Sequence, residues 1–145
     1  MGKPKTSKLV GTTALQAAGF AVLISLLPEP YANIGLSLFA MCMPAVYWGF
    51  AVSFNKGKVS GACVLQESVI LLLYGVLVAF TVAHAQHFAV GVVFLHGMID
   101  LLHAFKIFPH GEHVPGSYAL MCAVFDVMVT VVYLAATFLW GPKSG

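Results

Sequence analysis

Arginine is absent from this chain of 145 residues, and charged residues of every kind make up only 8% of it. A soluble domain carries charge on about a quarter of its residues, so this composition excludes an ordinary water-soluble protein. Because 60% of the residues are hydrophobic, we predict a single all-α integral membrane domain over residues 1–145. No soluble catalytic module fits beside it, so any chemistry has to take place between the helices.

Other absences narrow the range of functions. Without arginine, the chain lacks the guanidinium group that commonly binds phosphorylated and anionic ligands through two parallel hydrogen bonds. The net charge is only +2 and no basic cluster occurs, so a nucleic-acid partner is not expected. The sequence contains no serine nucleophile motif and no glycine-rich phosphate loop. Its three cysteines lie apart within apolar runs, which predicts buried thiols rather than a disulfide or zinc framework.

Five apolar segments are long enough to cross a bilayer, which takes about 20 helical residues. These segments cover residues 9–27, 31–54, 62–83, 88–108 and 118–140. Pro44 is expected to kink the second segment. The first segment is interpreted as a span and not a cleaved signal peptide, because its apolar part is long and no small-x-small cleavage site follows it.

Lysine placement predicts the orientation, because cytosolic loops of membrane proteins are enriched in basic residues. A cytosolic N-terminus puts only Lys143 on the outside. It puts the other lysines on the inside, namely Lys3, Lys5, Lys8, Lys56, Lys58 and Lys106. We therefore expect a multi-pass membrane protein with its N-terminus in the cytosol. A eukaryotic source implies the endoplasmic reticulum, and any other source implies the inner or plasma membrane.

Three carboxylic acids, Glu67, Asp100 and Asp126, interrupt the predicted spans. At a helical rise of about 1.5 Å per residue, all three lie roughly 10–12 Å from the cytosolic end of their spans. His96 and His103 flank Asp100 at i, i+4, i+7 spacing, so these three residues share one helix face. Because ionisable groups facing lipid are costly, this face is expected to look into the bundle, towards the other two acids.

Neutral polar residues at a similar depth are candidates for binding a substrate. They are Gln16 in the first span and Tyr47 in the second, and each is equally open to a packing role. Polar groups can also serve only to fix helix packing, but so many at one depth favour a functional site. His110 and His113 fall in the loop after the fourth span, where they are expected to be solvated or to form part of a lid.

The stretch from the third to the fifth span resembles a small family of bacterial and fungal integral membrane proteins of unknown function. The family's pattern of Glu, then His-x-x-x-Asp-x-x-His, a proline-containing loop and Cys-x-x-x-Asp matches several positions here. These are Glu67, His96, Asp100, His103, Pro109, Pro115, Cys122 and Asp126, and the Glu29-Pro30 pair after the first span also fits. The family often has a second consecutive histidine, where this chain has Ala104.

The chain also resembles the small membrane-bound epoxide hydrolases and cyclases of fungal polyketide and polyether pathways. The resemblance lies in size, in the number of spans and in the intramembrane acids. It implies a function in secondary metabolism, by epoxide hydrolysis or by epoxide-opening cyclisation.

Buried acids and imidazoles suit acid–base chemistry on a neutral, lipophilic substrate. Opening an epoxide needs a proton donor for the leaving oxygen and a base for the attacking water or hydroxyl, and paired carboxyls can divide these roles. Asp100 and Asp126 are the candidate pair, and Glu67 is a third acid that could exchange with either. His96 and His103 would orient the carboxylates or shuttle protons. The same groups could isomerise or cyclise a terpenoid by protonation.

Two other classes of function stay open. The histidines and carboxyls could hold iron, manganese or zinc, although the acid–base interpretation needs neither a metal nor a cofactor. Intramembrane acids and histidines also form the proton relays of carriers. The expected partners are a small lipophilic substrate and membrane lipid, and the site could be built within one chain or in a homodimer.

Overall fold

The structure is a computed structural model that describes residues 6–54, 59–108 and 113–141. Over these residues the chain is helical and contains no strand, as predicted. The helices are α1 (Thr6–Ser25), α2 (Glu29–Gly49), α3 (Gly61–His84), α4 (Ala89–Ala104) and α5 (Gly116–Trp140). A π-helical turn, η1 (Phe50–Phe54), continues α2, and a 3-10 turn, η2 (Gln86–Phe88), precedes α4.

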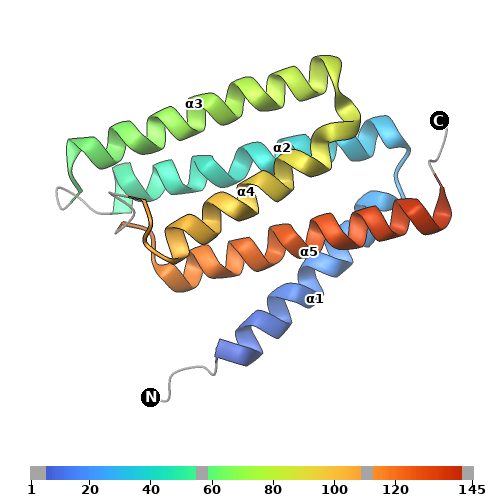
Figure 1. The fold of residues 1–145 in the computed structure, drawn as a ribbon, viewed down its shortest axis with the longest axis horizontal. Helices are drawn as coiled ribbons and strands as arrows, with labels where there is room; N and C mark the ends of the chain where they lie inside the picture. The colour runs from blue at the N-terminus through green and yellow to red at the C-terminus, as the bar shows by residue number, and fades with distance from the viewer. Residues whose placement is uncertain (1–5, 55–58, 109–112, 142–145) are drawn as a thin grey trace.

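Successive helices run back and forth, so that the two ends of the chain lie at opposite ends of the bundle (Figure 1). α2 packs against both α3 and α4, and α4 in turn packs extensively against α5. α1 covers another side of α5 and crosses it at an angle (Figure 1). The order of neighbours is therefore α3, α2, α4, α5, α1, which places α3 and α5 on opposite sides of the α2–α4 pair.

Three helices are long and apolar enough to cross a membrane, which is consistent with a membrane protein. They are Glu29–Val52, Gly61–His84 and Gly116–Trp140. Leu9–Ser25 and Ala89–Ala104 are shorter apolar helices. Most of the lysines that predict the orientation lie outside the described residues, namely Lys3, Lys5, Lys56, Lys58 and Lys143.

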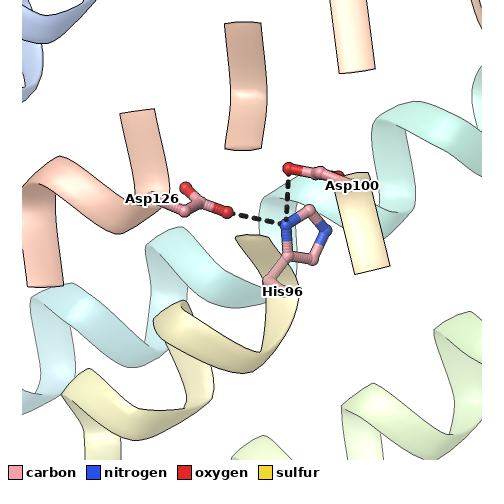
Figure 2. Close-up of side chains that lie close together, drawn as sticks. All are labelled: His96, Asp100 and Asp126. Atoms are coloured by element: carbon pink, nitrogen blue, oxygen red, sulfur yellow. Dashed lines mark hydrogen bonds and ion pairs between the residues drawn. The ribbon is translucent and has the colours of Figure 1, made fainter. Parts of the chain in front are cut away.

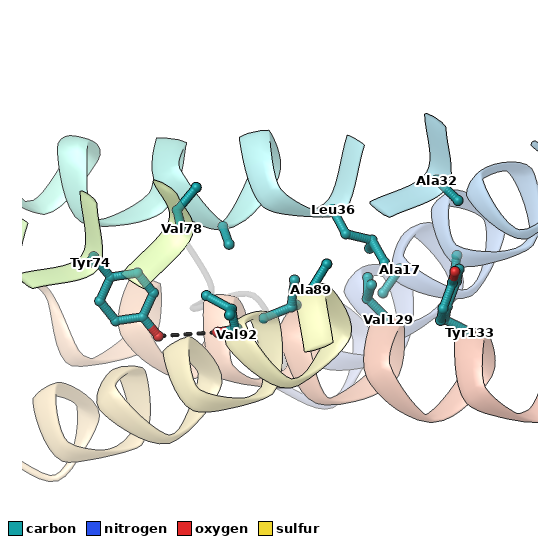
Figure 3. Packing of buried hydrophobic residues seen from close by; sticks show 12 residues of the cluster. Ala17, Ala32, Leu36, Tyr74, Val78, Ala89, Val92, Val129 and Tyr133 are labelled. Carbon is teal, nitrogen blue, oxygen red and sulfur yellow. Dashed lines mark hydrogen bonds between the residues drawn. The ribbon is translucent and has the colours of Figure 1, made fainter. Parts of the chain in front are cut away.

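Alanine and valine make up most of the buried core, which lets the helices approach one another closely (Figure 3). α1 illustrates the pattern with a buried small or hydroxyl residue at every fourth position, Thr13, Ala17, Ala21 and Ser25. Between α3 and α4, the Tyr74 hydroxyl donates a hydrogen bond of 3.1 Å to the Val92 carbonyl oxygen (Figure 3). This bond fixes the two helices relative to each other near the middle of the bundle.

α4 ends sooner than the predicted span over residues 88–108. The backbone N–H of Ile107 donates to the Leu102 carbonyl at 2.9 Å, and that of Lys106 donates to the His103 carbonyl at 3.0 Å. Lys106 has a φ of 57°, the left-handed conformation that closes a helix in this pattern. The helix therefore ends at Ala104, one residue after His103, and the chain turns at Lys106.

Candidate functional site

The centre of the bundle holds a cluster of His96, Asp100 and Asp126, called here the His96 cluster. His96 and Asp100 lie one turn apart on α4, and Asp126 faces them from α5 (Figure 2). His96 Nδ1 lies 2.8 Å from Asp126 Oδ2 and 3.3 Å from Asp100 Oδ2. One imidazole nitrogen therefore contacts two carboxylates, as the dashed lines in Figure 2 show.

Burying the polar groups of this cluster lowers the stability of the fold. His96 is 1% exposed, and Asp100 and Asp126 are fully buried at 0%. The contact of His96 Nδ1 with Asp126 is a hydrogen bond. Four other buried atoms of the cluster have no hydrogen-bond partner, namely both carboxyl oxygens of Asp100, Asp126 Oδ1 and His96 Nε2. Buried polar atoms without partners each cost about 1–3 kcal/mol, so packing alone is a poor explanation for keeping them.

Aromatic rings surround the cluster on the α2 and α3 sides. The ring of Tyr74 meets His96 edge-on, with centroids 5.4 Å apart. Tyr47, predicted as a substrate-binding residue, is 2% exposed and its ring centroid lies 6.0 Å from that of His96. Its hydroxyl interacts with Asp100 but makes no hydrogen bond of good geometry. Tyr47 of α2 and Tyr74 of α3 thus each place a phenol ring beside the cluster.

Gly97 brings α4 and α5 close enough for the cluster to form. A Cβ atom added at Gly97 would lie 3.0 Å from Asp126 Cβ and 3.5 Å from the carbonyl oxygen of Ala123. A side chain here would press on the Cβ of Asp126, whose carboxylate binds His96, and would require a shift of a few tenths of an ångström. The close helix contact at Gly97 thus positions Asp126 beside His96.

A second polar cluster lies towards the end of the bundle where α3 begins and α4 ends. It comprises Cys63 and Glu67 of α3, His103 of α4 and His113 from the segment before α5, and is called here the Glu67 cluster. Glu67 Oε1 lies 3.1 Å from His103 Nε2 and 3.5 Å from His113 Nε2. Cys63 Sγ lies 3.1 Å from His113 Nδ1. The Glu67 and His113 side chains are each 1% exposed.

The single polar layer predicted from helical depth is therefore divided in two. Glu67 and His103 pair with each other and not with Asp126, because α2 and α4 stand between α3 and α5. The Tyr47 ring connects the two clusters, since its centroid lies 4.8 Å from that of His103. Gln16, the other candidate for substrate binding, is exposed on α1 and lies outside both buried clusters.

Two members of the Glu67 cluster were not predicted as site residues. His113 was expected to be solvated or in a lid, and its side chain is instead buried against Glu67. Cys63 and Cys122 are buried, as predicted, whereas Cys42 is exposed. The i, i+4 spacing of Cys63 and Glu67 on one helix was a signal in the sequence that could have grouped the thiol with the acid. His110 lies outside the described residues.

Two hollows in the surface lie apart from the polar residues of these clusters. A cavity of about 570 Å³ opens near the C-terminal end of α5 and is lined by residues that include Glu29, Asn33, His87 and Tyr133. A smaller groove of about 300 Å³ runs between α3 and α4, with an almost wholly apolar lining that includes Val92 and Leu95. The groove approaches the His96 cluster through Val92, which accepts the hydrogen bond from Tyr74.

The imidazole and carboxyl groups of the His96 cluster determine which chemistry the site can perform. A neutral imidazole between two carboxyls can hold a proton and pass it to either side, and carboxyls with the histidine could also bind a divalent cation. No protein-family model, curated protein or solved structure matches this chain. The geometry of the two clusters therefore carries the functional argument.

Proposed function

We propose that this protein is a membrane-embedded enzyme that uses the His96 cluster for acid–base chemistry on a small, neutral, lipophilic substrate. The observation that carries the proposal is one imidazole nitrogen within 3.3 Å of two fully buried carboxylates from adjacent helices. A packing contact needs only one such pair. A second buried carboxylate without a hydrogen bond lowers stability, and such groups in membrane proteins mark functional sites.

The proposed reaction is the opening of an epoxide. Asp100 in its protonated form donates its proton to the epoxide oxygen as the C–O bond breaks. Asp126 as the carboxylate takes a proton from the attacking oxygen, which forms the new bond to carbon. Water as the nucleophile gives a diol, and a hydroxyl of the substrate itself gives a cyclic ether. Protonation of a terpenoid double bond would use the same donor.

His96 restores the starting state in this scheme. After one turnover the proton has moved from Asp100 to Asp126, because one carboxyl gave a proton and the other received one. His96 Nδ1 contacts both carboxylates, at 3.3 and 2.8 Å. An imidazole can accept a proton from one neighbour and release it to another, so this nitrogen is placed to return the proton without help from water.

The groove between α3 and α4 is the proposed entrance for the substrate. Its apolar lining suits a molecule that arrives from the hydrocarbon core of a bilayer. Tyr74 stands between groove and cluster, because its hydroxyl binds the carbonyl of the groove residue Val92 and its ring packs against His96. Rotation of this side chain would open a path from the groove to the buried carboxyls.

The proposal includes five membrane crossings with a cytosolic N-terminus. The alternating helix directions and the separation of the chain ends in Figure 1 support it. α4, with 16 residues, is about 24 Å long. That length is shorter than the roughly 30 Å of a bilayer core, so residues of η2 would complete this crossing. The proposed location is the endoplasmic reticulum for a eukaryotic source and the inner or plasma membrane for any other source.

The test uses protein purified in lipid nanodiscs and a panel of lipophilic epoxides in ¹⁸O-labelled water. We expect the wild-type protein to release a diol that carries the label, or an isomeric cyclic ether, as detected by mass spectrometry. Asp126→Asn should abolish the product while the protein still elutes as a folded species. Glu29→Gln is the matched control, because it changes an exposed acid at the other end of α2. Full turnover by Asp126→Asn would refute the acid–base role.

Metal binding at the His96 cluster is a second candidate function. One ligand atom each from His96, Asp100 and Asp126 lie within 4.8 Å of one another, which is close enough to converge on one ion. Elemental analysis of protein purified without added metal separates the candidates. Stoichiometric metal that disappears in Asp126→Asn favours metal binding at this cluster, and metal-free protein with turnover favours the acid–base proposal.

A further inference from the structure

We infer that Cys63, His113 and Glu67 form a thiol-dependent acyl-transfer site, separate from the His96 cluster. The Cys63 thiol attacks the carbonyl carbon of a neutral, lipophilic ester and holds the acyl group as a thioester. Enzymes with a cysteine nucleophile place a histidine against the thiol and a third side chain against the histidine. Here the thiol and the carboxyl group lie one turn apart on α3, and the histidine comes from the segment before α5.

The contacts follow the order of nucleophile, base and orienting group. Cys63 Sγ lies 3.1 Å from His113 Nδ1. The other nitrogen of the same ring, His113 Nε2, lies 3.5 Å from Glu67 Oε1. A thiol that donates to Nδ1 leaves the ring proton on Nε2, the nitrogen that faces the glutamate. This second distance is long for a hydrogen bond, as contacts between catalytic groups often are before a substrate binds.

The first turn of α3 provides a positive potential at Cys63. α3 begins at Gly61, and the backbone N–H of Cys63 donates to the N-cap side chain of Ser60 at 3.2 Å. A helix N-terminus and an adjacent imidazole both stabilise the thiolate form of cysteine, which is the form that reacts. The N–H groups of Gly61 and Ala62 have no acceptor within the helix. They are the groups that would bind the oxyanion of a tetrahedral intermediate.

Cys63 lies directly below an exposed surface. It is 3% exposed, whereas Gly61 and Ala62 before it are both exposed. A Cβ atom added at Gly61 would meet nothing within 4 Å, so the described part of the chain leaves the start of α3 open. A substrate therefore has only a short distance to cover before it meets the thiol.

The position of Cys63 along α3 favours an ester that is dissolved in the membrane. With 24 residues, α3 is about 36 Å long, which exceeds the roughly 30 Å of a bilayer core. The first turn of a centred α3 would thus lie at the boundary of the hydrocarbon core, where lipophilic esters place their carbonyl groups. The absence of arginine favours a neutral ester over an anionic acyl donor.

The proposed step moves an acyl group from oxygen to sulfur. Because burial disfavours a free thiolate, the thiol proton passes to His113 Nδ1 as the sulfur of Cys63 bonds to the carbonyl carbon. The C–O bond to the alcohol then breaks, and His113 gives the proton to the departing oxygen. Water repeats the sequence on the thioester and releases a carboxylic acid. Glu67 is a positioning residue, because it acts through the imidazole that it contacts.

Acylation by p-nitrophenyl decanoate, a neutral lipophilic ester, tests the site in the full-length protein in detergent. We expect the wild-type protein to release one p-nitrophenolate per chain in a burst. Mass spectrometry of its peptides should find a hydroxylamine-sensitive decanoyl group on Cys63. His113→Gln should slow the burst by about 100-fold or more, the usual loss with a general base. Glu67→Gln should lower the rate constant of the burst and leave the half-saturating ester concentration unchanged.

Cys42→Ser is the matched control, because it removes an exposed thiol outside the cluster. It should give the same burst as the wild-type protein. All variants should keep the helix content of the wild type by circular dichroism, and the burst is measured without an epoxide, so its outcome is independent of the acid–base proposal. A decanoyl group on Cys42 or Cys122 but not on Cys63 of the wild-type protein would overturn the inference, as would an equally fast burst in folded His113→Gln.

Discussion

Replacing Gly97 by alanine tests whether α4 and α5 meet where the His96 cluster requires it. The added Cβ would lie 3.0 Å from Asp126 Cβ, whereas carbon atoms in good contact are about 3.5–4.0 Å apart. The neighbouring atoms on α5 therefore have to give way by a few tenths of an ångström at this point. Overpacking of this kind costs about 1–3 kcal/mol, and the same movement lengthens the 2.8 Å contact between Asp126 and His96.

Gly91 provides the matched control on the same helix. A Cβ atom at Gly91 meets nothing within 4 Å, so Gly91→Ala changes only the intrinsic preference for helix. That preference favours alanine over glycine by about 1 kcal/mol. The helix contribution is common to both variants and cancels in their difference. Gly97→Ala should therefore be about 1–3 kcal/mol less stable than Gly91→Ala.

Unfolding of both variants by sodium dodecyl sulfate in mixed micelles, followed by circular dichroism, measures this difference. Because the contact also aligns the cluster, Gly97→Ala should lose turnover out of proportion to its lost stability, since the rate depends steeply on the placement of catalytic groups. Equal stabilisation in the two variants would mean that α4 and α5 do not touch at Gly97, and the geometry of the His96 cluster would then be wrong.

One further prediction concerns a single contact. Tyr74→Phe removes the hydrogen bond to Val92 and should lower the free energy of unfolding by about 1 kcal/mol. Tyr31→Phe, at a tyrosine that is 66% exposed, should have almost no effect. Equal effects of the two substitutions would contradict the contact.

The helical class of the protein and the burial of its acids were predictable from the sequence. The scarcity of charge and the long apolar runs predicted helices, and the cost of acids in lipid predicted that Glu67, Asp100 and Asp126 face inward. Their exposures of 1%, 0% and 0% confirm that burial. The i, i+4 spacing of His96 and Asp100 also predicted one shared face, which the structure has.

The division into two clusters was not predictable in the same way. Helical rise gives the depth of a residue in its span, but it does not say which helices are neighbours. Glu67 and Asp126 share a depth and still belong to different clusters, because α3 and α5 lie on opposite sides of the α2–α4 pair. Gln16 illustrates the same limit, since α1 buries the adjacent Ala17 and leaves Gln16 exposed.

Turnover of the Asp100→Asn and Asp126→Asn proteins, singly and combined, tests the acid–base account most directly. Groups that act as one unit are not additive, because loss of either stops the same step. We predict that each single variant loses turnover of the lipophilic epoxide and that the double variant is no slower than the slower single one. Wild-type turnover in either folded single variant would contradict the account.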